Sequence, residues 1–379
     1  MQTGLRDDVE HLAAIERPSA SPGEREAAEW IAERFRAEGL DTTVDEERVH
    51  PSFWWPIGLL NAAALAGRAA ALVAVALLVD DVDHRRRWFR GLLPKRSTYN
   101  VTAEAGDPDA ERTIVIVAHH DAAHGGAIFD TRGIEAAAGR FPKLFERVTR
   151  WPPMMWGVVI GPLLLALGRR RMGSIWAAGT IAAMADIART PVVPGANDNA
   201  AAVAVLLQLA KRRYDGVRVL LVSTGSEESN ADGMKEWGRR HFDELPRETT
   251  SFVALETLGS GNLAIAEAEG FLVAHGYDAE LKDLAERCAG DLGIPVWRGL
   301  TNSFMSDAIV PLHAGYPAML LGALDRFKLP SNYHKPWDTP DRLDYDCAAR
   351  AVDLLDALIR AYAAPARNIA IAGDFPLPE

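Results

Sequence analysis

Apolar residues follow two different periodicities along the chain, and the two kinds of segment alternate. The segment from Thr113 to Ala118 begins with Thr-Ile-Val-Ile-Val, a β-branched run that is typical of a strand buried on both faces of a sheet. Similar segments predict strands at 41–49, 100–104, 218–224, 251–256, 263–268 and 317–321. Periods near 3.6 residues predict helices at 5–17, 24–39, 200–213, 279–292 and 345–363. This alternation predicts an α/β fold in which helices flank a mostly parallel or mixed central sheet.

Two longer apolar stretches interrupt this alternation. Residues 53–79 contain one charged residue, Arg68, and residues 151–188 are apolar apart from the arginine triplet 169–171 and Asp186. If these stretches spanned a membrane, each would have to cross it an even number of times, because the strands before, between and after them can join one sheet only on the same side. Two helices of about 20 residues do not fit in either stretch. We therefore expect two apolar helical hairpins that pack on each other, on a second subunit of a homodimer, or shallowly on a membrane surface.

The hairpins divide the predicted organisation into one domain and two insertions. We expect the α/β domain to comprise residues 1–50 and 98–379, with helical insertions at 51–97 and 140–192. The basic run Arg85-Arg86-Arg87 flanks the first hairpin. A run of this kind is more often solvated than bound, although it also has the charge to contact anionic lipid headgroups.

Composition places the chain among ordinary globular proteins. Of 379 residues, 48% are hydrophobic and 25% are charged, which excludes a wholly disordered or coiled-coil chain. A net charge of −11 argues against nucleic acid as a partner. Cys288 and Cys347 are too few for a disulfide scaffold or a thiolate metal cluster, and the first fifty residues show no secretory signal. We expect a cytoplasmic protein in which any metal is bound by His, Asp and Glu.

Seven His, Asp and Glu residues stand at the ends of predicted strands or in turns. Each alone has a common structural explanation, because adjacent acids are usually solvated and Asn and Asp are frequent helix caps. Together they can meet at one edge of the sheet, where the carboxyl ends of strands in open α/β folds bind ligands. Oxygen and imidazole donors suit Zn²⁺ in a hydrolytic site, and this many acids can serve two ions that share a carboxylate. The seven are His119, Asp121, Asp198, Glu227, Glu228, Glu256 and His334.

At these positions the sequence resembles the zinc aminopeptidases of peptidase family M28. The shared pattern is Ala-His-x-Asp, Gly-Ala-x-Asp-Asn, Glu-Glu, an acid after a strand, Tyr-His and Asp-Thr-Pro-Asp, and the chain meets it in this order. These motifs begin at Ala118, Gly195, Glu227, Glu256, Tyr333 and Asp338. The resemblance covers nearly the whole chain outside the two apolar insertions, and it implies that the α/β domain is a peptidase domain.

The resemblance also implies a metal ligand set. His119 and Glu256 would hold one zinc ion, Glu228 and His334 would hold a second, and Asp198 would bridge the two. The implied activity is hydrolysis of the peptide bond that follows the amino-terminal residue of a peptide.

Two further acids would have roles other than metal binding. The resemblance implies that Glu227 is the general base that takes a proton from water and hands it to the leaving amine. It implies that Asp121 accepts a hydrogen bond from the His119 ring and so fixes its tautomer. A cis peptide bond between Asp198 and Asn199 is another feature that the family implies.

Residues that contact the substrate have no comparable motif. We expect Ser303 and the residues up to Asp307, together with Tyr333, to line the substrate pocket, because they lie in loops beside the last predicted strand and His334.

Glu256 departs from the family pattern, which usually has Asp at this position. The additional methylene changes how the carboxylate reaches the first metal, and it favours as an alternative a glutaminyl-cyclase-like acyltransferase that works with a single zinc. A non-catalytic scaffold on the same fold is a further alternative. The presence of both Glu227 and Glu228 argues against a scaffold, because a binding module has no need of the proton-transferring acid.

Overall fold

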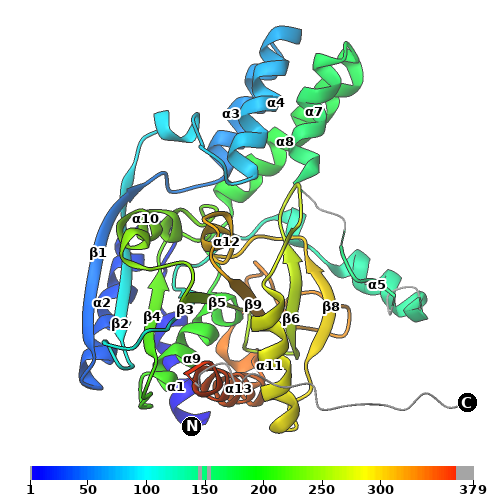
Figure 1. Ribbon diagram of the computed structural model, residues 1–379. Helices are drawn as coiled ribbons and strands as arrows, with labels where there is room; N and C mark the ends of the chain where they lie inside the picture. Colours follow the sequence, from blue (N-terminus) through cyan, green and yellow to red (C-terminus); the bar gives the residue numbers. More distant parts are fainter. Residues whose placement is uncertain (1, 144–146, 152–154, 364–379) are drawn as a thin grey trace, which may run out of the picture.

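The computed structural model describes residues 2–143, 147–151 and 155–363, and a mixed β-sheet forms its centre (Figure 1). The strand order is β1-β2-β4-β3-β5-β9-β6-β7, and β8 pairs with β6 outside this order. Strands β4, β3, β5 and β9 run parallel, whereas β1, β2, β6 and β7 have antiparallel neighbours. The strands are β1 Asp41–Val49, β2 Arg96–Glu104, β3 Thr113–His119, β4 Arg218–Thr224, β5 Thr250–Glu256, β6 Asn262–Glu269, β7 His275–Gly276, β8 Trp297–Asn302 and β9 Ala318–Leu324. The predicted fold class is confirmed.

Helices cover both faces of the sheet. Successive residues of β3 alternate between two hydrophobic clusters: Ile114 and Ile116 belong to the cluster of α1, α2, α9, α11 and α13, and Val115 and Val117 belong to that of α10 and α12. Burial on both faces explains the uninterrupted apolar run of this strand. The helices are α1 Gln2–Ala13, α2 Pro22–Ala37, α5 Arg132–Arg140, α9 Ala201–Leu209, α10 Asp232–His241, α11 Ala279–Asp291, α12 Ile309–His313 and α13 Tyr345–Ala363.

The observed elements follow the prediction with local differences. The bounds predicted for β1, β4 and α13 are confirmed. The first helix ends at Ala13, not at residue 17, because Pro18 disfavours a helical conformation at Arg17. The Arg17 guanidinium instead donates hydrogen bonds to the carbonyl groups of Leu12 (2.8 Å) and His120 (2.7 Å). The sequence did not predict α10, which is rich in charged residues, the two-residue strand β7, or β8.

The two apolar stretches form helical hairpins, as expected. One hairpin is α3 (Trp54–Ala64) with α4 (Arg68–Val82), and the other is α7 (Trp156–Ala166) with α8 (Arg170–Arg189). The hairpins pack on each other, α3 against α8 and α4 against α7. We call residues 54–82 and 156–189 the helical post, which projects beyond one end of the sheet (Figure 1).

The helices of the post have 11 residues in α3, 15 in α4, 11 in α7 and 20 in α8. Among the residues that the structure describes, we find no helix with the length and apolar character needed to cross a membrane. Residues 152–154 belong to the predicted stretch 151–188, and residues 144–146 and 152–154 belong to the predicted insertion 140–192. Residues 364–379 belong to the predicted α/β domain. All of these lie outside the described residues. The predicted domain boundaries stay a prediction.

The basic run beside the post is divided between surface and interior. Arg85 and Arg86 are exposed, whereas Arg87 is buried in an ion pair with Asp232. The expectation of a solvated run is therefore wrong for Arg87. The acid and the carbonyl group of Asn230 provide partners for the buried guanidinium, and a buried charge requires such partners.

Candidate metal centre

The predicted site residues gather at the carboxyl ends of the parallel strands. His119 is the last residue of β3, and Glu256 is the last residue of the adjacent strand β5. The acid pair 227–228 follows β4, on the other side of β3. Asp198 lies just before α9, and His334 comes from the loop after β9. Five segments that are far apart in the sequence thus meet at one edge of the sheet.

Asp198 lies between the two imidazoles. One of its carboxylate oxygens is 3.4 Å from His119 Nε2, and the other is 3.3 Å from His334 Nε2. Glu256 lies 3.5 Å from the first of these nitrogens, and Glu228 lies 3.2 Å from the second. The structure therefore contains two groups of three potential ligands that share Asp198, and the donor atoms in each group lie within 4.8 Å of one another.

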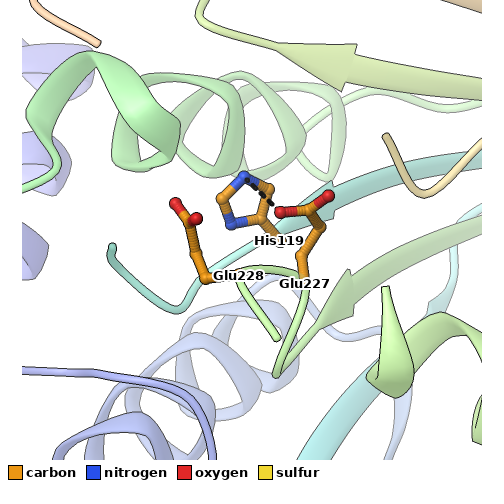
Figure 2. A group of neighbouring side chains, drawn as sticks. All are labelled: His119, Glu227 and Glu228. Carbon is orange, nitrogen blue, oxygen red and sulfur yellow. Dashed lines mark ion pairs between the residues drawn. The ribbon is translucent and has the colours of Figure 1, made fainter. Parts of the chain in front are cut away.

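Figure 2 shows how the acid pair lies about His119, with which it forms a third group of potential ligands within 4.8 Å of one another. The carboxylates of Glu227 and Glu228 lie on opposite sides of the His119 ring. Glu227 is 3.9 Å from His119 Nε2, whereas Glu228 pairs with His334. Consecutive residues in an irregular turn thus present their carboxylates to different parts of the cluster, as two distinct roles would require.

The backbone at Asp198 is closely supported. The peptide bond between Asp198 and Asn199 is cis, which confirms the feature that the family resemblance implied. The Asp338 carboxylate accepts hydrogen bonds from the backbone N–H groups of Asn197 (3.0 Å) and Asp198 (3.1 Å). The Asn199 side chain donates to the carbonyl group of Leu255 at 2.8 Å. These contacts explain why the Asp338 motif accompanies the Asp198 motif.

The cluster has the chemistry of a metal centre. Within the part of the chain that the structure describes, four of its buried polar atoms have no hydrogen-bond partner: Asp198 Oδ2, Glu228 Oε1 and both ring nitrogens of His334. Buried polar atoms are rarely left in this state. Carboxylate oxygens and imidazole nitrogens are also the ligands that zinc accepts where thiolates are absent. The residues therefore fit zinc.

Burial concentrates negative charge in this cluster. Burial raises the pKa of Glu256 to about 7 and the pKa of Glu227 well above its usual range. Burial acts to lower the pKa of His334, but the Glu228 and Asp198 carboxylates together outweigh it and raise that pKa to about 10. The pKa of His119 is raised in the same way, mainly by Glu256 acting against burial. Divalent cations would replace these protons as the compensating positive charge.

The turn that carries the acid pair is held by two buried carboxylates. Asp121 accepts hydrogen bonds from the backbone N–H groups of residues 227 (3.0 Å) and 228 (3.1 Å). Glu24 accepts hydrogen bonds from the backbone N–H (3.0 Å) and the hydroxyl (2.9 Å) of Ser226. The Asp121 carboxylate also lies 3.4 Å from Nδ1 of His119. One acid therefore supports both an imidazole and the acid pair.

Two buried arginines hold the other side of the same turn. Arg90 donates a hydrogen bond to the carbonyl group of Ser229 (2.6 Å) and pairs with both oxygens of Asp81 (2.7 and 2.9 Å). Arg87 donates to the carbonyl group of Asn230 at 2.5 Å. Asn230 has a φ of 84°, a left-handed conformation that persists in a non-glycine residue only when its surroundings enforce it. The segment after α4 thus fixes the turn that bears Glu227.

The sequence analysis missed these supporting residues. Arg17, Glu24, Arg87 and Arg90 are buried, and their partners lie far away in the sequence. Glu24 reads as an ordinary acid in the first turn of a helix capped by Ser21. No local pattern distinguishes such residues from surface charges, so only the tertiary structure identifies them.

Two apolar cavities meet beside the acid pair, and both are lined by Glu227, Ser303 and Tyr333. Asp307, the other residue expected in the substrate pocket, lines neither cavity. It is buried, and its carboxylate accepts a hydrogen bond from the Thr224 hydroxyl. The first cavity includes Trp151, Ala264, Ala266, Leu300 and Leu320, and the second includes Phe53, Phe129, Val158, Met184 and Ile187.

The fold and the site define the class of protein first. A mixed sheet with imidazoles and carboxylates converging at the ends of its parallel strands is the arrangement of a metal-dependent hydrolase. Residues 179–359 match the model of peptidase family M28. The resemblance inferred from the motifs is thereby confirmed.

Solved structures share the fold over nearly the whole chain. The aminopeptidase from Aneurinibacillus sp. strain AM-1 matches with a TM-score of 0.58 and 13% identity, over 95% of this chain and 93% of that one. A zinc aminopeptidase from Bacillus subtilis matches with a TM-score of 0.58 and 13% identity, over 95% of this chain and 94% of that one. Fimbriiglobus ruber glutaminyl cyclase matches with a TM-score of 0.57 and 15% identity, over 95% of both chains. No curated protein sequence matches the chain. Identities this low show the fold alone.

Zinc affinity should fall as the pH falls through about 7. Glu256, with a pKa raised to about 7, is a carboxylate above that pH and a neutral acid below it, and His334 must release its proton to bind a cation. Titration calorimetry of the metal-free chain at about pH 6 and about pH 8, in buffers of different ionisation enthalpy, should show weaker binding at the lower pH and proton release at both. An affinity that does not change with pH would contradict these protonation states.

Arg90→Lys should lower the kcat of peptide hydrolysis about tenfold to a hundredfold. An ammonium group cannot replace the planar guanidinium, so the turn that bears Glu227 should shift. Steady-state hydrolysis and circular dichroism of the same samples would separate this effect from unfolding. Arg86→Lys is the matched control, since Arg86 is exposed four residues away. Equal turnover of the two variants would show that Arg90 does not position the turn.

Proposed function

We propose that the chain is a zinc-dependent aminopeptidase that hydrolyses the amino-terminal peptide bond of peptides. The observation that carries the proposal is the position of Asp198 between the two imidazoles, which produces two ligand groups with one carboxylate in common. The match to peptidase family M28 supports a peptidase. Two of the solved structures with the same fold are described as aminopeptidases, which agrees with this choice.

Five side chains would hold two zinc ions. His119 and Glu256 would bind the first, Glu228 and His334 the second, and Asp198 both. Zinc ions, when bound, would lower the pKa of a water molecule and polarise the scissile carbonyl group. The longer side chain of Glu256 does not take its carboxylate out of the cluster, since it lies 3.5 Å from His119 Nε2. This distance supports a first metal site despite the departure from the family pattern.

Glu227 is the proposed general base. It lies beside the ligand groups and lines both cavities, so it can face the substrate and the attacking water together. Burial raises its pKa well above the usual range, which makes the ionised carboxylate a stronger proton acceptor. It would take a proton from the water and give it to the leaving amine. Asp121 would keep this carboxylate in place through the backbone N–H of Glu227.

The cavities favour peptides with apolar side chains near the scissile bond. Ser303 and Tyr333 line both cavities, and we assign them to substrate contact. Tyr333 also stacks on the His334 ring, with ring centroids 3.8 Å apart, so it orients that imidazole. Asp307 lies near Glu227 and adds to the effect of burial on the pKa of that base. The proposed role of Asp307 is therefore to raise the pKa of Glu227. Substrate contact at Asp307 stays a prediction.

A glutaminyl-cyclase-like acyltransferase is the second candidate. It is favoured by the fold shared with Fimbriiglobus ruber glutaminyl cyclase and by Glu256 in place of Asp. The presence of two complete ligand groups favours the aminopeptidase. Metal content separates the two: two tightly bound zinc ions per chain count for the aminopeptidase, and one zinc with cyclisation of amino-terminal glutamine counts for the cyclase.

The cytoplasm is the compartment we propose. Cys288 and Cys347 are both buried and unpaired, as expected of cysteines in a reducing environment. A peptide substrate is the proposed partner of the site, and nucleic acid is not, given the net charge of −11.

Glu227→Gln should leave zinc bound and lower peptide hydrolysis about a hundredfold to ten-thousandfold, because the amide cannot accept the proton. The measurement is hydrolysis of a panel of amino-acyl p-nitroanilides, before and after chelation, with zinc content determined in the same samples. Glu280→Gln, at an exposed position of α11, is the control and should match the native chain. Unchanged turnover in Glu227→Gln would remove Glu227 as the base. A native chain that cleaves no member of the panel, with zinc bound, would overturn the proposed activity.

Alanine at Ser303 or Tyr333 should change the order of preference within the same panel. Both side chains border the cavities, so their removal enlarges the space for the substrate side chain, and we expect at least about a tenfold change in relative kcat/KM for one substrate pair. Ser97→Ala on β2, far from the cavities, provides the control. An unaltered preference profile in both variants would place the two residues outside the substrate pocket.

A further inference from the structure

The helical post carries most of the exposed large hydrophobic side chains of the described molecule. In the described part of the chain, 18 large hydrophobic side chains are exposed, and 11 of them lie on the post. All four of its helices contribute, among them Trp55 on α3, Leu72 on α4, Trp156 on α7 and Ile175 on α8. Most large apolar side chains of a monomeric soluble protein are buried, so this concentration on one projecting element is unusual and calls for an explanation.

The far end of the post carries the most exposed of these side chains. Its two turns, 65–67 and 167–169, lie side by side, because the Arg68 side chain donates a hydrogen bond to the carbonyl group of Ala166 at 3.1 Å. Around these turns, the exposed fraction is 60% for Leu72, 64% for Leu167 and 67% for Ile175.

The same end is cationic. Arg68 and the triplet 169–171 are all exposed. Residues 54–79 and 156–185 contain no Asp or Glu, so the post offers these arginines no acid of its own along those segments. The chain as a whole has a net charge of −11, and the far end of the post is therefore opposite in sign to the rest of the molecule.

We propose that the far end of the helical post docks on an anionic lipid bilayer. Apolar side chains at a docking site enter the boundary between headgroups and acyl chains to a depth of about 5–10 Å, and lipid phosphates at that level pair with arginines. Arginine suits this position because its planar guanidinium binds a phosphate through two hydrogen bonds and its aliphatic stem remains among apolar groups. Leu72, Leu167 and Ile175 supply the apolar side chains. Arg68 and the triplet 169–171 supply the arginines that pair with phosphate groups.

The post docks on the bilayer without spanning it. Each hairpin contains one helix of 11 residues, α3 or α7, which at 1.5 Å per residue measures about 16 Å, roughly half the thickness of the hydrocarbon region. Neither hairpin can therefore cross the bilayer and return, even though α8 has 20 residues. Insertion to the depth of a docking site also keeps the arginines at the headgroup level, where their charges are not desolvated.

A second copy of the chain fits this surface less well. In a two-fold dimer formed through the far ends of two posts, the arginines would approach each other without an intervening acid from residues 54–79 or 156–185. Anionic lipid instead offers opposite charge over the whole end of the post. The base of the post, including Val158, Met184 and Ile187, lines the second cavity beside Glu227, so docking of the far end would hold the candidate site at the opposite end of the post from the bilayer.

The test is flotation of the full chain with vesicles of phosphatidylcholine alone and of phosphatidylcholine mixed with phosphatidylglycerol. We expect binding to the mixed vesicles that weakens with added salt. Replacing the triplet 169–171 with glutamine should lower the partition coefficient about a hundredfold, as expected from the loss of three cations at an anionic surface. Leu72→Ser with Leu167→Ser should lower it at least about tenfold. These positions are exposed, and circular dichroism will verify that each variant is folded.

Two matched controls use exposed residues outside the post. Arg239→Gln with Arg240→Gln removes two cations on α10, and Leu292→Ser removes an exposed leucine beyond α11. Both should partition like the native chain. Equal binding to the two kinds of vesicle, or equal losses in the controls, would overturn the proposal. Recovery of the native chain in the buffer with both vesicles would also overturn it, and a dimer in sedimentation experiments would then assign the apolar surface to a second copy. None of these outcomes depends on the proposed peptidase activity.

Discussion

The structure depends on the burial of several carboxylates at one edge of the sheet. Asp121, Asp198, Glu227, Glu228 and Glu256 lie within one cluster, and burying so many like charges is costly unless cations are placed among them. The chain provides only part of that positive charge, through two imidazoles and Arg17. Protons can compensate for the rest, as the raised pKa values of Glu227 and Glu256 indicate, and divalent cations would replace those protons.

The rest of the fold serves to hold this unfavourable arrangement in place. Parallel strands β3 and β5 end in His119 and Glu256, so the sheet itself sets one ligand group. The turn bearing the acid pair cannot rely on regular structure, and it is fixed from opposite sides. Asp121 and Glu24 bind its N–H groups, and the two buried arginines after α4 bind its carbonyl groups. The first insertion is therefore a structural part of the site.

The sequence predicted the components of the site because their chemistry is local. A buried strand followed by His119-His120-Asp121, or a Glu-Glu pair after a strand, is visible in a few consecutive residues, and strand order explains why such motifs meet. The sequence did not predict the supports of the site, because Arg90 and Glu24 are buried by partners more than a hundred residues away. Nor did it predict that Asp307 lies behind the cavities, since a loop position does not reveal which way a side chain points.

The most direct measurement of the central claim is anomalous X-ray scattering at the zinc edge from crystals of the chain grown with zinc. Two anomalous peaks are expected at the carboxyl ends of β3 and β5. One should contact His119 and Glu256, the other should contact Glu228 and His334, and both should contact Asp198. Crystals in which these five side chains contact no metal, with zinc bound elsewhere or not at all, would contradict the account.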